Sequence, residues 1–147
     1  MAEFRFARAE DIPALLPLMR DFYEYERLPF DAHRIERLLH ELITNEQFGH
    51  AILFDKANQL AGYMILTFGY SLEFGGRDAL IDEFYVVPDA RGGGVGAQAI
   101  AYAVELCRAR GLTDIHLEAD HFNARVHEFY KRLGFRDHPR HLMTLSI

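Results

Sequence analysis

A group of glycines directly after a predicted buried strand is the feature of this 147-residue sequence best suited to chemistry. The strand, residues 79–87, is largely apolar, and a Pro-Asp-Ala-Arg turn leads from it to Gly92, Gly93, Gly94 and Gly96, which open a helix. Glycines allow close approach of the backbone to a ligand, and a helix N-terminus presents free N–H groups and a positive dipole end. The junction therefore predicts a binding site for a nucleotide-like anion.

Hydrophobic periodicity and turn residues predict the elements that position this junction. A strand around Phe4 and two helices come first, the second capped by Asp31. The later part alternates strands and helices and ends in the strand LMTLSI, with a further short strand expected near Phe135. The order is βααβββαβαβ. The expected strands lie near 50–54, 60–70, 79–87 and 114–119, and the expected later helices run from the glycines to Gly111 and from Asn123 to Gly134.

Composition indicates one globular domain over residues 1–147, half of them hydrophobic. The net charge of −6 argues against a general nucleic-acid binder. One cysteine, Cys107, excludes an internal disulfide, and no stretch has the apolar length of a signal core or a membrane span. We therefore expect a cytoplasmic protein without a membrane partner.

A dinucleotide-binding fingerprint is the main competing interpretation of the glycines. Residues 94–99 satisfy G-x-G-x-x-A, and Glu118 follows at about the distance of a ribose-binding acid. However, a dinucleotide fold repeats parallel βαβ units, and the chain after Gly96 has room for about one crossover. The hairpin-rich region before the motif also disagrees with that fold.

Two separated motifs resemble the GNAT superfamily of N-acetyltransferases. Residues 91–97, RGGGVGA, match the family loop (Q/R)-x-x-G-x-(G/A), and residues 123–135, NARVHEFYKRLGF, resemble its N…Y…GF segment. The element order is also similar to that of the family. The resemblance implies an α/β (α+β) single-domain GNAT-like fold, with a mixed central sheet of six to seven strands and helices on both faces.

The resemblance implies acetyl-coenzyme A as the co-substrate, held where two parallel strands splay apart. The pantetheine arm would then pair with the backbone of the strand matching 80–87, and the pyrophosphate with the N–H groups of the glycine loop. Arg91 is either a ligand or an ordering group of this loop, and Asn123 either contacts the coenzyme or only caps its helix. The implied coenzyme-binding residues are Phe84, Tyr85, Val86, Arg91, Gly92, Gly93, Gly94, Val95, Gly96, Ala97 and Asn123.

Acetyl transfer to an amine needs a base and a proton donor for the leaving sulfur. The resemblance implies Tyr130 as the general acid; a core tyrosine is the alternative. Glu83 is the expected base, and a salt-bridged acid is the alternative. Asp82, on the opposite face of an alternating strand, is the reserve, with Glu118 and Asp120 behind it.

The acceptor is expected to be a small cationic amine, because acids gather near the end of the first helix. The expected acceptor-binding residues are Glu24, Tyr25, Glu26 and Asp82. A solvated helix face explains the same acids. A protein N-terminus or lysine is an alternative acceptor, and a non-catalytic coenzyme-A sensor is an alternative function. Family members are often homodimers, which leaves a dimer through LMTLSI open, and no metal is expected despite eight histidines.

Overall fold

The structure, a computed structural model, describes residues 1–147 and contains five strands and four α-helices. None of these helices combines the length and apolar character needed to cross a bilayer. Short 3-10 turns occupy Ala9–Asp11 and Pro88–Ala90. In chain order the elements are β1 (Glu3–Phe6), α1 (Ile12–Tyr25), α2 (Ala32–Thr44), β2 (Gly49–Lys56), β3 (Gln59–Ser71), β4 (Gly76–Val86), α3 (Val95–Ala109), β5 (Ile115–Leu117) and α4 (Ala124–Arg132).

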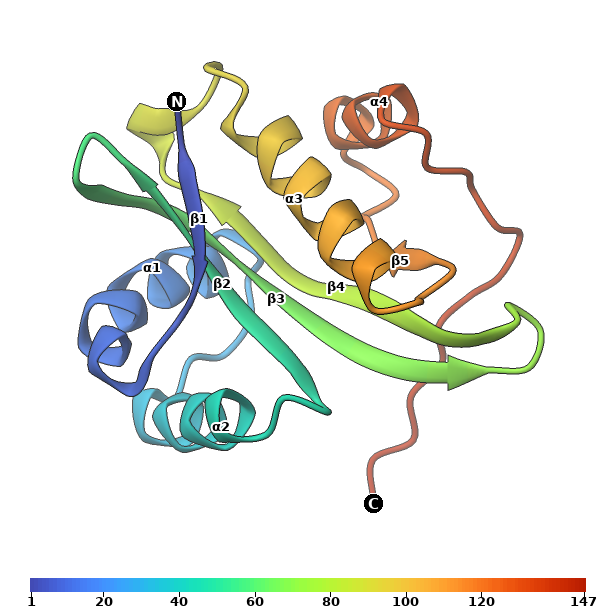
Figure 1. Cartoon of the computed structure of the whole chain (residues 1–147), viewed down its shortest axis with the longest axis horizontal. Coiled ribbons are helices and arrows are strands. Elements are labelled where there is room, and N and C mark those ends of the chain that lie inside the picture. Colours follow the sequence, from blue (N-terminus) through green and yellow to red (C-terminus); the bar gives the residue numbers. More distant parts are fainter.

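The five strands form one mixed sheet in the order β1-β2-β3-β4-β5 (Figure 1). Neighbouring strands are antiparallel except β4 and β5, which run parallel. A parallel pair needs a crossover, and α3 supplies it, so the glycine loop lies at the end of β4 where the chain leaves the sheet. The mixed sheet expected of an α+β fold is confirmed.

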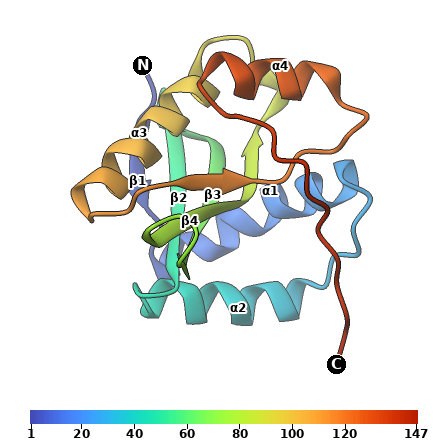
Figure 2. The ribbon, with the colours of Figure 1, turned by 90° about the vertical axis from the view of Figure 1, so that its right-hand side faces the viewer.

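Alternating side chains on the central strands divide the interior into two cores. Ala51 and Leu53 of β2 belong to a core with α1 and α2, whereas Ile52 and Phe54 belong to a core with α3. Cys107 lies buried in the second core. Helices therefore cover both faces of the sheet, as expected, and the views in Figures 1 and 2 show α3 on the side opposite α2.

The expectation of six to seven strands is wrong, because the sheet has five. Residues 133–147 form neither the strand expected at LMTLSI nor the one near Phe135. The C-terminal segment crosses in front of β5 and leaves the body of the protein (Figure 2). Leu142, Met143, Leu145 and Ile147 are all highly exposed. Their β-forming character is not sufficient, because a strand is stable only when a neighbour pairs with its backbone.

The pairing between β4 and β5 is short. It runs from Ala79 opposite Ile115 to Ile81 opposite Leu117, after which β5 ends and β4 continues alone on that side to Val86. The β3–β4 register shifts directly after this point, because Leu66 pairs with Ile81 but the preceding residue, Ile65, pairs with Glu83. The sheet thus opens on one edge of β4, close to the glycine loop.

Candidate active site

The glycine loop presents a run of free backbone donors. None of the N–H groups of residues 92–97 donates a hydrogen bond within the protein, and the first helical bond is from Gln98 N–H to Gly94 C=O at 3.0 Å. Gly92 and Gly94 have φ values of 80° and 83°, a conformation that a side chain disfavours. Six consecutive donors at the positive end of a 15-residue helix suit a pyrophosphate.

Two basic side chains lie beside this loop. The Arg91 Nε donates to the Val86 carbonyl at 2.8 Å, and its guanidinium carbon lies 5.5 Å from the centroid of the Tyr85 ring. Arg91 therefore ties the loop to the end of β4, which is the ordering role considered for it. Lys56, the last residue of β2, places its Nζ 3.1 Å from the position that a Cβ on Gly93 would take. It forms no ion pair, so it adds a positive charge next to the free donors.

The open edge of β4 carries further unpaired backbone groups. The Val87 N–H donates to the Ala61 carbonyl of β3 at 2.9 Å, so the backbone of Val87 faces β3. Because successive residues of a strand turn their backbone groups to opposite edges, those of Val86 and Phe84 face the open edge. Tyr85 instead pairs with Tyr63 of β3. The amide-bearing arm of a coenzyme would find partners at Phe84 and at the Val86 N–H, whereas the Val86 carbonyl already accepts from Arg91.

The fold brings the two sequence motifs into contact at Gly96. A Cβ on Gly96 would lie 3.2 Å from Phe129 Cζ of α4 and 3.8 Å from the Phe84 ring of β4. Asn123 begins α4, and its Oδ1 accepts from Val126 N–H at 3.2 Å, so its capping role is present. The start of α3, Phe129 of α4 and the open edge of β4 therefore meet at one place.

Glu83 is held by two tyrosines from different elements. Its Oε2 accepts from the Tyr23 hydroxyl of α1 at 2.7 Å, and its Oε1 accepts from the Tyr63 hydroxyl of β3 at 2.8 Å. It forms no salt bridge. Burial raises the pKa of the Glu83 carboxyl above its usual value, and the two hydroxyls partly oppose that rise.

Asp82 differs from its neighbour. It is the extra residue of a β-bulge, because Ile81 pairs with Leu66 while Glu83 pairs with Ile65. Its side chain is exposed and makes no hydrogen bond, although partial desolvation raises its pKa. The bulge places Ile81 in the core of α3 and directs Glu83 to the side of α1. Simple alternation along the strand could not give that arrangement.

Tyr130 lies on the inner side of α4 against Phe129 and Phe135, with ring centroids 5.2 and 5.5 Å away. Its hydroxyl makes no hydrogen bond to the protein. Burial, with a smaller contribution from the charge of Glu26, raises the pKa of Tyr130 to about 12. The hydroxyl is therefore protonated at neutral pH, as a proton donor must be.

The residues expected to bind the acceptor are only partly brought together. The charge of Glu26 raises the pKa of Tyr130, and the charge of Asp82 raises the pKa values of Tyr23 and Glu83. Glu24 and Tyr25 are exposed at the end of α1 and make no hydrogen bond or ion pair with the other site residues. The acidic surroundings of the site therefore come from Glu26 and Asp82.

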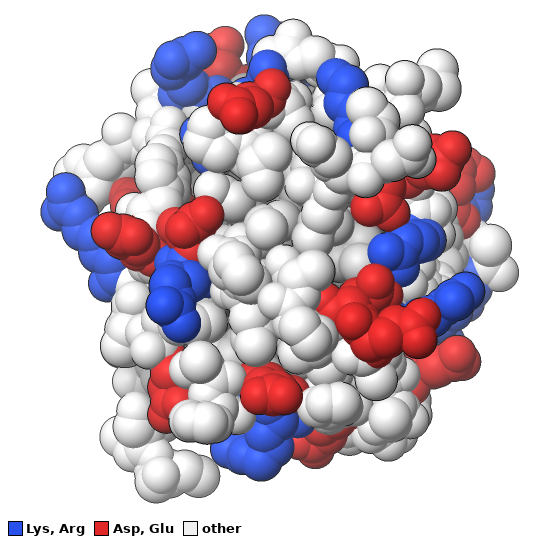
Figure 3. Space-filling model, turned by 90° about the vertical axis from the view of Figure 1, so that its left-hand side faces the viewer, with Lys and Arg blue, Asp and Glu red and all other residues white.

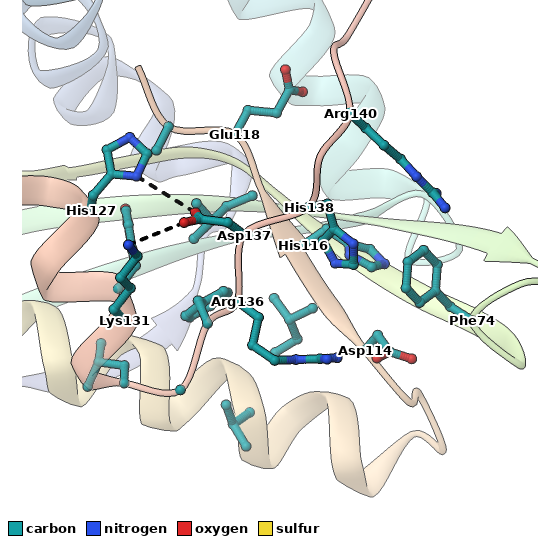
Figure 4. Close-up of a pocket in the computed structure, with 18 of the residues that line it drawn as sticks. Phe74, Asp114, His116, Glu118, His127, Lys131, Arg136, Asp137, His138 and Arg140 are labelled. Atoms are coloured by element: carbon teal, nitrogen blue, oxygen red, sulfur yellow. Dashed lines mark ion pairs between the residues drawn. The ribbon is translucent and has the colours of Figure 1, made fainter. Parts of the chain in front are cut away.

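A cavity of about 730 Å³ lies next to this site, over β5 and between α4 and the C-terminal segment. Figure 4 shows its polar wall, in which Asp137 pairs with Lys131 at 3.2 Å and with His127 at 3.9 Å. Tyr130 lines the cavity, but the glycine loop does not. Five histidines line it, yet no three His, Cys, Asp or Glu side chains converge with the geometry of a metal site.

Tyr63 and Lys56 are site residues that no sequence motif indicates. Tyr63 is fully buried in a β3 run that reads as ordinary core, and it meets Glu83 only through strand pairing. Lys56 reaches the loop from the end of β2, more than 30 residues earlier in the chain. The polar end of a tyrosine inside an apolar strand was the one available signal, because a buried hydroxyl needs a partner.

Comparisons with known proteins agree with this geometry. The model of the acetyltransferase (GNAT) family matches residues 12–135. A thialysine N-epsilon-acetyltransferase of Bos taurus is 28% identical over 142 residues, which cover 90% of this chain and 83% of that protein. A candidate ribosomal protein bS18-alanine N-acetyltransferase of Bacillus subtilis (strain 168) is 28% identical over 136 residues, covering 92% and 81%. The crystal structure of an integron cassette protein from the Cole Harbour Salt Marsh metagenome superposes with a TM-score of 0.86 and 29% identity, covering 98% and 90%.

Proposed function

The chain belongs to the GNAT family of acetyltransferases, and from that premise we propose that it moves the acetyl group of acetyl-CoA to the primary amine of a small cationic molecule. The acceptor would attack the thioester directly in a ternary complex. The observation that carries this proposal is that the free donors of residues 92–97 follow the open edge of β4, the same strand that carries the Glu83 carboxylate. Acetyl-CoA supplies the activated acyl carbon and the thiol leaving group.

Each residue then has a defined task. Residues 92–97 bind the pyrophosphate, Phe84 and Val86 align the pantetheine arm, and Glu83 removes a proton from the acceptor. An alkylamine has a pKa near 10.4, so fewer than about one molecule in a thousand is neutral at pH 7. A carboxylate ionised at that pH is therefore useful as a base. Tyr130 donates a proton to the departing sulfur.

A cationic acceptor fits the charges near the site. Glu26 and Asp82 are acidic, lie near Tyr130 and Glu83 respectively, and have no basic partner. The thialysine acetyltransferase relative carries a small amine in its name, which supports a small-molecule acceptor. On the side of the molecule in Figure 3, acidic and basic side chains are interspersed, without the continuous basic surface that nucleic acid requires.

Release of free thiol from acetyl-CoA tests the function. We expect the purified protein to release it when amines with a second positive charge are added, and to release it more slowly with neutral amines of equal length. The measurement is thiol formation across a panel of monoamines, diamines, amino-acid amines and peptides. No turnover with any amine, despite tight acetyl-CoA binding, would support a coenzyme-A sensor instead.

A protein N-terminus is the second candidate acceptor, favoured by the similarity to the candidate ribosomal-protein acetyltransferase. The peptide members of the panel distinguish the two. If a peptide with a free N-terminal alanine reacts faster than every small diamine, the small-molecule proposal is wrong.

A homodimer is a further proposal, because the sheet ends at an unpaired edge of β5 and the backbone of residues 142–147 makes no hydrogen bond within the chain. Met143, Leu145 and Ile147 would share one face of a strand, and all are highly exposed. The cavity over β5 gives room for that strand from a second copy. We expect light scattering to give twice the monomer mass, and Leu145→Lys to give the monomer. Ser146→Lys, on the opposite face, is the control, and a monomeric wild type would contradict the proposal.

A further inference from the structure

Three elements of the fold meet at the Glu83 carboxylate. We propose that Tyr23 and Tyr63 are positioning residues, whose hydroxyls hold Glu83 in one orientation and in its ionised form so that it can accept the proton of the acceptor amine. The inference rests on the proposed function, because it assigns to these tyrosines the preparation of the base.

The geometry supports two separate donors. Each hydroxyl takes a different carboxylate oxygen, at 2.7 Å for Tyr23 and 2.8 Å for Tyr63, so rotation of the carboxylate would break both bonds. A carboxylate has about four lone-pair sites, so roughly two remain for the amine or for a bridging water. The carboxylate is thus fixed while still able to accept a proton.

Aromatic packing holds the two hydroxyls in place. Tyr63 is fully buried, and its ring centroid lies 6.2 Å from those of Phe22 and Tyr85. Tyr23 is partly exposed, and its ring lies 5.4 Å from that of Phe30, in the segment between α1 and α2. One donor is therefore anchored in the core and the other reaches the surface beside the acceptor side of the site.

The charges around Glu83 explain why donors are needed. Burial favours the neutral carboxyl, and the negative charge of Asp82 on the same strand acts in the same direction, so both raise the pKa of Glu83. The tyrosine hydroxyls lower it, since they stabilise the ionised form. The pKa values of Tyr23 and Tyr63 are themselves raised, by burial and by Glu83, so both hydroxyls remain protonated donors. The charge of Arg34 in α2 opposes the rise in the pKa of Tyr23, whereas Tyr85 in β4 adds to the rise in the pKa of Tyr63.

This arrangement prepares the transfer of one proton from the acceptor ammonium to the Glu83 carboxylate. The N–H bond of the acceptor ammonium breaks, its electron pair stays on nitrogen, and the proton forms an O–H bond on Glu83. The neutral amine then attacks the acyl carbon, and the C–S bond breaks as the sulfur takes the Tyr130 proton. The extra proton on the adduct nitrogen is lost to solvent, and Tyr130 regains a proton from solvent. Glu83 returns its proton to water before the next turnover, which restores the carboxylate.

Tyr23→Phe is the main test, because it removes one hydroxyl and keeps the ring. We expect the midpoint of the acid limb of kcat/KM to move upward by about one pH unit, since a carboxylate that loses a donor is harder to ionise. Tyr63→Phe should move it in the same direction, and the double variant should move it further. The KM for acetyl-CoA should stay unchanged. Tyr102→Phe is the control and should leave the midpoint unchanged. Tyr102 lies in α3, where its ring stacks on that of Phe4 in β1.

A second readout does not depend on turnover. Glu83 can be titrated directly by carbon NMR of protein labelled at the glutamate carboxyl carbon, with its signal assigned by Glu83→Gln. We expect the Glu83 midpoint to rise by about the same amount in Tyr23→Phe. An unchanged NMR midpoint would overturn the inference even if the protein has no acetyltransferase activity.

The two readouts together separate the possible failures. If the NMR midpoint rises but the kcat/KM profile does not move, the hydrogen bonds are real and Glu83 is not the base, which overturns the positioning role. If only thermal stability falls, the tyrosines are packing groups, and the inference is again wrong.

Discussion

Replacing Gly94 with valine is expected to weaken acetyl-CoA binding at least about 100-fold. Gly94 has φ of 83°, a region that a β-branched residue strongly disfavours, so the substitution should rotate the adjoining peptides and turn their N–H groups away from the ligand. A hydrogen bond to a charged group contributes about 1.5–3 kcal/mol, so losing two of them costs at least about 3 kcal/mol. Calorimetric titration with acetyl-CoA measures this loss.

The same helix offers a matched control at its other end. Gly111 has φ of 74° and open space around its α-carbon, so Gly111→Val imposes a similar backbone strain far from the loop. We expect comparable losses of thermal stability in the two variants, but an acetyl-CoA affinity within about twofold of wild type for Gly111→Val. If both variants bind equally well, the loop is not the pyrophosphate site.

The loop could be predicted from sequence because all its determinants are local. Gly92, Gly94 and the start of α3 are consecutive in the chain, and a helix N-terminus exposes its N–H groups wherever it lies. Asn123 is similar, because its capping bond spans three residues. For these features the sequence and the structure give the same answer.

The environment of Glu83 could not be predicted in the same way. Its two hydroxyl donors lie 60 and 20 residues earlier in the chain, and strand register decides that they meet it. The β-bulge at Asp82 changes which face Glu83 occupies, and no residue type in that strand announces a bulge. The presence of an acid on this strand can be read from the sequence, whereas its partners and its orientation cannot.

The strand expected at LMTLSI shows a third kind of limit. Its alternation and β-forming residues are local, but pairing requires an available neighbour, and the adjacent edge strand β5 is only three residues long. The sequence therefore indicates a tendency toward strand structure that this single chain does not realise.

In the proposed mechanism Glu83 acts as the base and Tyr130 as the acid. Burial raises the pKa of both side chains, which hinders a base but helps an acid. For Glu83 it opposes the ionised form that a base requires, and the two tyrosines offset part of that effect. For Tyr130 it favours the neutral hydroxyl that an acid requires, so no compensating donor is needed.

Changing Tyr130 to phenylalanine is expected to lower kcat about 10- to 100-fold, with little change in the Kd for acetyl-CoA. A thiol has a pKa near 8.5, well below the value of about 12 for Tyr130, so the thiolate can leave without full protonation and the loss should fall short of complete inactivation. The ring keeps its packing on Phe129 and Phe135, which separates the hydroxyl from the hydrophobic contact. Tyr102→Phe in α3 is again the control and should retain wild-type kcat. The measurements are steady-state kinetics with an amine from the panel and calorimetric titration with acetyl-CoA. An unchanged kcat would make Tyr130 a core residue only. An equal loss of kcat and of acetyl-CoA affinity would make Tyr130 a binding group and not the proton donor.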